Sequence, residues 1–140
     1  MKYYPEKKLH NVDTLDNKLI FNIIGNYVLE SQNDNGTIPS NADGSFDPWD
    51  FIESITAINF IGDIGNAEKA FLWLKANQND DGSWYAKYSS NGDILEKNKP
   101  THFSPYISIG LLHYYKIFLN KEFLKNLWPT VEKALNFSLS

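Results

Sequence analysis

Two similar stretches of sequence decide the fold of this chain: NYVLESQNDNGTI at residues 26–38 and LWLKANQNDDGSW at residues 72–84. Each is the polar end of an apolar, helix-forming segment, and each continues into Gln, Asn, Asp, one further residue and Gly. The two glutamines, Gln32 and Gln78, lie 46 residues apart (78 − 32). An internal repeat of roughly 20–50 residues is typical of stacked helical hairpins, so the repeat predicts an all-α fold.

The segments around these stretches show the helical spacing of apolar residues. We expect five helices, over residues 15–32, 48–61, 67–78, 105–119 and 121–139. Asp13 or Thr14 is predicted to cap the first helix and Asn66 the third. The pair Ser104–Pro105 predicts the start of the fourth helix, and Pro129 predicts a kink or a restart in the last.

The connections between these helices alternate in length. Residues 33–47 and 79–103 are long polar loops, whereas the other two connections are turns of a few residues. In a stack of antiparallel helices, this alternation places both long loops at one end. Long loops at one end of a scaffold commonly carry the function, so we expect the functional site there.

The helices also alternate in character. The segments 48–61 and 105–119 are apolar nearly all round, whereas 67–78 is apolar on one side and charged on the other. A helix that is apolar on every side is expected to be buried on every side. The second and fourth helices are therefore predicted to form an inner layer, with the other three outside it.

The residues around Gln78 resemble the QW motif of the squalene–hopene cyclase and prenyltransferase (terpenoid cyclase) superfamily. Seven positions match in identity and spacing: Lys69, Ala70, Trp73, Leu74, Gln78, Gly82 and Trp84. The first copy of the repeat is a degenerate form, because Ile38 stands in place of the tryptophan. Residues 47–58 and 127–140 look like bacterial proteins called prenyltransferase-like, so the resemblance covers the chain from about residue 26 onward.

This resemblance implies an (α/α)6 toroid, in which the glutamine closes the end of an outer helix and the tryptophan stacks on it. A full toroid of this kind has twelve helices, and this chain supplies five or six. We therefore expect residues 1–140 to form a single all-α domain that is an incomplete toroid. Helical hairpins stacked without closure leave an apolar edge, which predicts a homodimer or a second half-toroid as partner.

Composition restricts the class of function. The chain has 140 residues and a net charge of −4, which argues against nucleic-acid binding. It has no cysteine, which excludes thiolate zinc sites and cysteine nucleophiles. No apolar stretch reaches the ~20 residues of a membrane span, and the N-terminus lacks the apolar core of a signal peptide. These features predict a cytoplasmic protein.

The candidate catalytic residues are the carboxylates at the start of the second helix: Asp47, Asp50 and Glu53, with Asp43 nearby. Asp50 and Glu53 are three residues apart and share a helix face. Neighbouring carboxylates can separate their pKa values and then act as acid and base. A structural alternative exists, because Asp47 is a natural N-cap and Asp50 can complement it in the first turn.

Four further side chains are predicted to bind substrate at the same end: Trp49, Tyr88, His102 and Tyr106. Aromatic walls stack on sugar rings and stabilise carbocations. His102 can act as an acid, a base or a hydrogen-bond donor, although a loop histidine also suits a plain surface position. His102 and His113 have no third ligand nearby, so we predict no metal site and no cofactor.

The departures from the superfamily separate its fold from its activities. The chain contains no Asp-rich DxDD motif and no cysteine for zinc, so neither known activity transfers residue by residue. The resemblance favours a prenyltransferase- or terpene-cyclase-like protein acting on an isoprenoid. One alternative is a carbohydrate-active, glycosidase-like toroid with paired carboxylates, and another is a non-catalytic binding module. The expected ligand is a small molecule, either an isoprenoid or a glycan.

Overall fold

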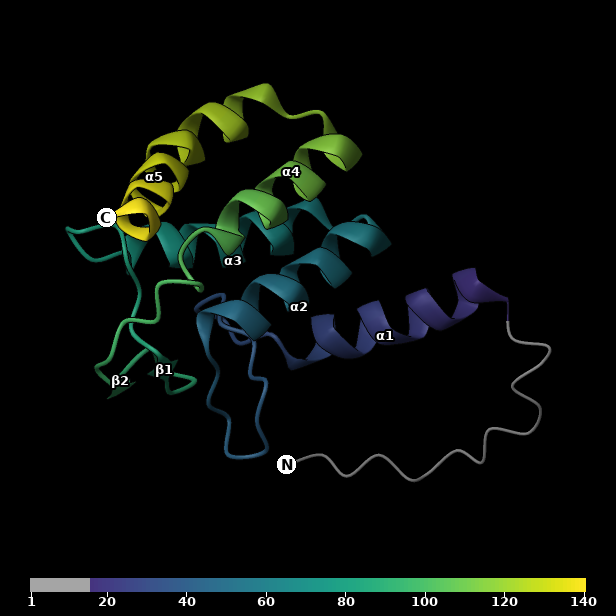
Figure 1. Cartoon of the computed structure of the whole chain (residues 1–140). Coiled ribbons are helices and arrows are strands. Elements are labelled where there is room, and N and C mark those ends of the chain that lie inside the picture. The colour runs from purple at the N-terminus through teal and green to yellow at the C-terminus, as the bar shows by residue number, and fades with distance from the viewer. Residues whose placement is uncertain (1–15) are drawn as a thin grey trace.

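A computed structural model, which describes residues 16–140, confirms a fold built almost entirely of α-helices (Figure 1). The helices are α1 (Asn17–Ser31), α2 (Pro48–Ile61), α3 (Ile64–Ala76), α4 (Tyr106–Phe118) and α5 (Lys121–Leu139). Two short antiparallel strands, β1 (Lys87–Tyr88) and β2 (Ile94–Glu96), pair within the connection between α3 and α4. The all-α prediction is confirmed, although the sequence did not indicate the two strands.

Four of the five helices begin at a short polar side chain that accepts a hydrogen bond from the first turn: Asp16, Asp47, Asp63 and Asn120. The prediction that Asn66 caps α3 is wrong, because Asp63 accepts a hydrogen bond from the Asn66 N–H and the helix begins at Ile64. The predicted cap of α4 is also wrong. Pro105 stands at the N-cap without a side-chain bond. Asp13 and Thr14 lie outside the described residues.

The helix α5 runs unbroken from Lys121 to Leu139 with Pro129 inside it. The predicted restart at this proline is therefore wrong. Pro129 costs the helix one backbone hydrogen bond, because proline has no N–H. The apolar side of α5, which buries Phe123, Leu127 and Val131, keeps the helix packed on the core across this defect.

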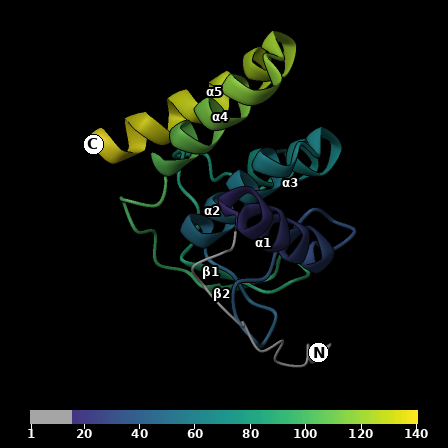
Figure 2. The same ribbon diagram turned by 90° about the vertical axis from the view of Figure 1, so that its right-hand side faces the viewer.

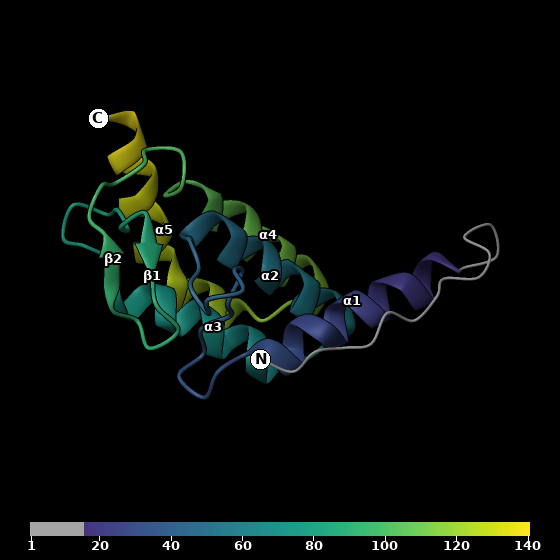
Figure 3. The same ribbon diagram turned by 90° about the horizontal axis from the view of Figure 1, so that it is seen from below.

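The helices form two layers. The outer helices are α1, α3 and α5, and the inner helices are α2 and α4. The helix α2 packs against α1, α3 and α4, and α4 packs against α2 and α5. In Figure 2, α4 and α5 lie above α3, and α1 and α2 lie below it, whereas Figure 3 shows α1 running out beyond the other helices.

The core lies between the two layers and is rich in aromatic rings. Phe46, Phe51, Trp73 and Tyr88 form one cluster of tilted, edge-on and stacked pairs with ring centroids 5.0–5.7 Å apart. All four side chains are almost completely buried. Such rings contribute both buried apolar area and favourable ring geometry to stability.

The predicted all-round burial of the inner helices is only half correct. The helix α2 buries most of its apolar residues and exposes Phe60 and Glu53. The helix α4 exposes three aliphatic side chains, Ile109, Leu112 and Ile117. The described residues therefore cover α2 far more completely than α4.

The repeated turns that follow α1 and α3 each tie one outer helix to the next. The Gln32 side-chain amide donates a hydrogen bond to the Asn66 carbonyl of α3 at 3.0 Å. The Gln78 side-chain amide donates to the Thr130 carbonyl of α5 at 2.8 Å. Each amide also donates to a carbonyl of its own turn. The repeat seen in the sequence is thus a connection between neighbouring outer helices.

The glycine of each turn is required by a close backbone approach. Gly36 and Gly82 adopt left-handed φ values of 95° and 90°. A Cβ atom would lie 2.7 Å from the Lys69 carbonyl oxygen at Gly36 and 2.2 Å from the Lys133 carbonyl oxygen at Gly82. Only glycine fits both the backbone conformation and this spacing.

The two long connections lie at the same end of the helices, as predicted. Phe46 and Tyr88 exchange two backbone hydrogen bonds of 3.0 and 2.9 Å. The Thr37 hydroxyl donates to the Ser90 carbonyl at 2.7 Å. These bonds join the loop before α2 to the connection before α4, and the start of each inner helix lies beside them.

Candidate functional site

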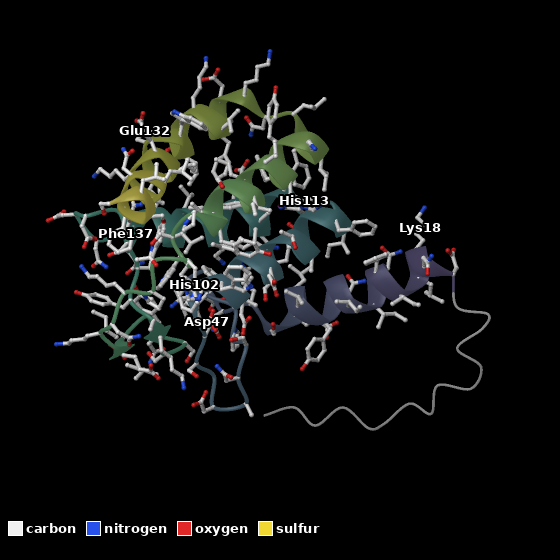
Figure 4. The ribbon with its side chains drawn as sticks, in the orientation of Figure 1. Lys18, Asp47, His102, His113, Glu132 and Phe137 are labelled. Atoms are coloured by element: carbon white, nitrogen blue, oxygen red, sulfur yellow. The ribbon has the colours of Figure 1, made fainter. Side chains whose placement is uncertain are left out.

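An open cleft of about 340 Å³ lies at the loop end, at the start of α2. Asp47, Trp49 and Asp50 line it from α2, and His102 and Phe103 line it from the connection before α4. Figure 4 shows Asp47 and His102 next to each other at this end of the molecule. The structure therefore brings four predicted site residues together and adds Phe103, which the sequence analysis did not single out.

A larger hollow of about 490 Å³ lies at the opposite end, between α1 and the turn that joins α2 to α3. Asn22, Asn26 and Asp63 provide its polar side chains. Asp63 caps α3 through both of its carboxylate oxygens, which bond to Asn66. This hollow thus offers no pair of reactive groups, and the cleft at the start of α2 is the stronger candidate.

Asp47 and Asp50 form the acidic part of the cleft. The Asp47 carboxylate accepts a hydrogen bond from the Asp50 backbone N–H at 2.9 Å, so Asp47 does fill the capping role. Burial raises the pKa of the Asp50 carboxyl above its ordinary value, and the neighbouring Asp47 carboxylate raises it further. A hydrogen bond with the Ser40 side chain opposes this shift. Asp50 thus holds its proton more strongly than an ordinary aspartate does, and it does so beside an open cleft.

Glu53 holds two aromatic rings together beside the acidic pair. One carboxylate oxygen, Oε1, accepts a hydrogen bond from the Trp49 indole N–H at 2.9 Å and one from the Tyr106 hydroxyl at 3.2 Å. The two rings stack face to face, with centroids 4.0 Å apart and an interplanar angle of 5°. Burial and the Glu53 charge raise the pKa of the Tyr106 hydroxyl, so this group stays a hydrogen-bond donor. The three side chains form one rigid unit across α2 and α4, which we call the aromatic clamp.

His102 is exposed and extends the aromatic wall of the cleft. Its ring centroid lies 6.0 Å from that of Trp49 and 4.6 Å from that of Phe103. The imidazole therefore borders the space beside the acidic pair. Its place supports the predicted contact with a ligand.

Tyr88 does not belong to the cleft, which corrects the prediction that it binds substrate. Its side chain is 2 % exposed, and its hydroxyl accepts a hydrogen bond from the Tyr85 backbone N–H at 2.8 Å. Burial raises the pKa of Tyr88 to about 12. The ring lies in the core because its backbone pairs with that of Phe46, which draws this segment under the loop.

His113 lies away from the cleft, further along α4 (Figure 4). Its Nδ1 atom lies 3.3 Å from the Asn59 side-chain nitrogen, and burial followed by the Lys116 charge lowers its pKa. Within residues 16–140, no group of three or more His, Asp and Glu side chains is placed to hold a metal ion. The helices of this described part also include none that is long and apolar enough to cross a membrane.

No protein-family model matches this chain. Over 110 residues, it is 32% identical to a protein of Mycolicibacterium hassiacum named MMP endo-(1,4)-3-O-methyl-alpha-D-mannosidase. The similar region covers 79% of this chain and 30% of that protein, so this chain spans about a third of the relative's length.

This similarity corrects the identification from the QW motif. The chain was predicted to resemble prenyltransferases and terpenoid cyclases, whereas the protein it is similar to is named a glycosidase. The physical reason for the error is visible in the turns. Gln78 and Gly82 tie α3 to α5, which is a requirement of stacked hairpins and carries no information about the substrate.

Proposed function

We propose that this chain forms the acid-bearing part of a glycosidase that cleaves a mannose-containing glycan. The observation that carries the proposal is the Asp50 carboxyl, whose pKa burial and Asp47 raise beside an open, aromatic-lined cleft. The similarity to a named mannosidase supports this chemistry over the isoprenoid alternative. We further propose that residues 16–140 act as one domain and form part of a helical toroid.

Asp50 is proposed as the proton donor. Hydrolysis of a glycosidic bond replaces the leaving oxygen on the anomeric carbon with the oxygen of a water molecule. The leaving oxygen needs a proton as its bond to that carbon breaks, and a carboxylic acid with a raised pKa supplies it. The proton that the water loses restores the acid over the whole reaction. Asp47 is proposed as the charged neighbour that keeps the proton on Asp50. Its own carboxylate is fixed by the first turn of α2, so it cannot turn away from Asp50.

The aromatic clamp is proposed to bind the sugar. The faces of pyranose rings carry C–H groups that pack on flat aromatic surfaces, and O-methyl groups add further apolar area. Trp49 lines the cleft, and its stacking on Tyr106 fixes the plane that it presents. Glu53 is therefore proposed as a positioning residue for the clamp, and His102 as a donor or acceptor to sugar hydroxyls.

The test is hydrolysis of (1,4)-linked α-mannosides, with and without 3-O-methyl groups, followed by the release of reducing ends. The full chain is assayed beside Asp50→Asn. We expect Asp50→Asn to lower kcat by about 10²–10⁴-fold with its fold unchanged, because the amide cannot donate an acidic proton.

Asp34→Asn serves as the matched control, since Asp34 is exposed in the turn after α1 and lies outside the cleft. This variant is expected to keep the wild-type rate. Equal activity of Asp50→Asn and wild type would remove the proposed role.

A further inference from the structure

The inner helices α2 and α4 occupy equivalent positions in the repeat, in a register that the residues at both ends define. Pro48 at the start of α2 corresponds to Pro105 before α4. Gly62 and Leu119 end the two helices, both in the left-handed conformation, with φ values of 83° and 54°. The residue after each of them caps the next outer helix. Every residue of α2 therefore corresponds to the residue of α4 that lies 57 positions later (105 − 48 and 119 − 62).

One side of α2 is covered by α4. Ile52 faces Gly110, since a Cβ atom on that glycine would lie 2.7 Å from the Ile52 Cγ2 atom. Two turns further along, the Asn59 side chain lies opposite His113, with 3.3 Å between their nitrogen atoms. Ile55 lies on the same side of the helix, between these two contacts. Ile52, Ile55 and Asn59 are all completely buried.

The corresponding side of α4 carries Ile109, Leu112 and Lys116 and is uncovered. Ile109 is 55 % exposed and Leu112 is 53 % exposed, although their counterparts in α2 are buried. In a stack of repeats, each copy buries its apolar side against the next one. We propose that this surface of α4 binds a further helical hairpin of the same repeat type, supplied by a polypeptide segment outside these 140 residues.

A second copy of this chain does not fit this surface in the repeat register. In that register, α2 of the second copy would pack on α4 of the first copy in the way that α4 packs on α2 within one chain. Glu53 of the second copy would then take the place that Gly110 occupies in this packing. The Glu53 carboxylate would be pressed against Ile109, where the crossing of α2 and α4 has space for a hydrogen atom alone. Burying an unpaired carboxylate against an aliphatic side chain is costly.

The same correspondence defines the chemistry of the bound helix. Its residue opposite Ile109 is Gly, as Gly110 is opposite Ile52. Its residue opposite Lys116 is a hydrogen-bond acceptor or an acid, as His113 is the partner of Asn59. A helix at this place would border the cleft, because Ile109 lies one turn after Tyr106 of the aromatic clamp. The proposal stands on packing and does not depend on the proposed function.

The test replaces Leu112 of the full chain with photoreactive p-benzoylphenylalanine in its native cells and identifies the cross-linked peptide by mass spectrometry. Leu72 is the matched control position, an exposed leucine on the outer helix α3. We expect a product from position 112 alone, joined to a helical segment outside residues 1–140 that has the small residue described above. The purified complex should lose about ten-fold or more in affinity with Leu112→Glu and remain unchanged with Leu72→Glu.

Circular dichroism of both glutamate variants checks that each is folded, as expected for exposed positions. A cross-link between two copies of this chain would overturn the choice of occupant. Equal cross-linking from positions 72 and 112, or none from position 112, would show that the α4 surface is free and overturn the proposal.

Discussion

The turn after α3 and the start of α2 differ in one respect: the turn is repeated elsewhere in the chain, and the acidic start of α2 is not. The turn holds Gln78 and Gly82 against α5 through backbone carbonyls and is repeated after α1 with the same contacts to α3. The start of α2 holds Asp47 and Asp50 at an open cleft, and the corresponding residues at the start of α4 are Ser104 and Ile107. A feature that recurs in every copy of the repeat is required by the fold, whereas a feature present in one copy indicates the function.

Replacement of Gly82 by alanine tests the scaffold side of this comparison and has the largest expected effect. A methyl group at this position would lie 2.2 Å from the Lys133 carbonyl oxygen, at a φ of 90° that alanine disfavours. We expect a loss of about 3 kcal/mol or more in the free energy of unfolding, and a fall of about 10 °C in Tm. Thermal unfolding followed by circular dichroism measures both.

Gly62→Ala is the matched control for Gly82→Ala. Gly62 has a similar φ of 83°, but no atom lies within 4 Å of its added Cβ. Only the conformational cost of about 1 kcal/mol is expected there. Equal losses in the two variants would show that backbone strain, and not the approach to α5, makes Gly82 necessary.

The sequence predicted the scaffold well because its signals are local. Apolar periodicity placed all five helices, and the alternation of loop lengths placed both long connections at one end. Where prediction was wrong, a choice between nearby groups decided the result. Asp63 and Asn66 can each cap a helix, and Asp63 is the cap in the structure, because its carboxylate accepts a hydrogen bond from the Asn66 N–H.

The candidate site was predictable only in part, because its decisive contacts are distant in sequence. Asp47 and Asp50 were found from the charge at a helix start. The roles of Glu53 and Tyr88 were not, since Glu53 bonds to Tyr106 from another helix and Tyr88 pairs with Phe46 from another loop. The QW motif misled the assignment of function because it describes how outer helices join.

Replacement of Glu53 tests the chemical side of the comparison, and an intermediate effect is expected. Glu53→Gln keeps an oxygen that can accept both hydrogen bonds from Trp49 and Tyr106, so activity should fall only a few-fold. Glu53→Leu removes the acceptor and releases the stacked rings, so kcat/KM should fall by about ten-fold. Steady-state kinetics on the mannosides, with tryptophan fluorescence of each variant, provides the measurement.

The contrast between glutamine and leucine separates two roles for Glu53. A loss of about 100-fold or more in Glu53→Gln would mean that the carboxylate itself takes part in the reaction. Tyr106→Phe is the companion variant, because it removes one of the two hydrogen bonds and keeps the ring. It should resemble Glu53→Gln in rate.

The smallest expected effect concerns both regions, because it measures how much the Asp50 carboxylate at the cleft lowers the stability of the fold. Its pKa is raised in the folded protein, so the protonated form stabilises the fold below the ordinary pKa of an aspartate, and this contribution is lost as the pH rises through the raised value. Asp50→Asn has no such loss. Its Tm should therefore equal that of wild type at acid pH and exceed it by about 1–3 °C at neutral pH.

The comparison must be made as a difference between variant and wild type at each pH. Asp81 acts in the opposite sense: its bonds to Lys99 and Ser83 lower its pKa to about 2, so its contribution is lost only in acid. That change is common to both proteins and cancels in the difference. If Asp50 donates the proton, kcat/KM of wild type must fall over the same pH range in which the Tm difference appears, because both follow ionisation of the Asp50 carboxyl in the free protein. If activity and the Tm difference changed over different pH ranges, the catalytic acid would be a residue other than Asp50.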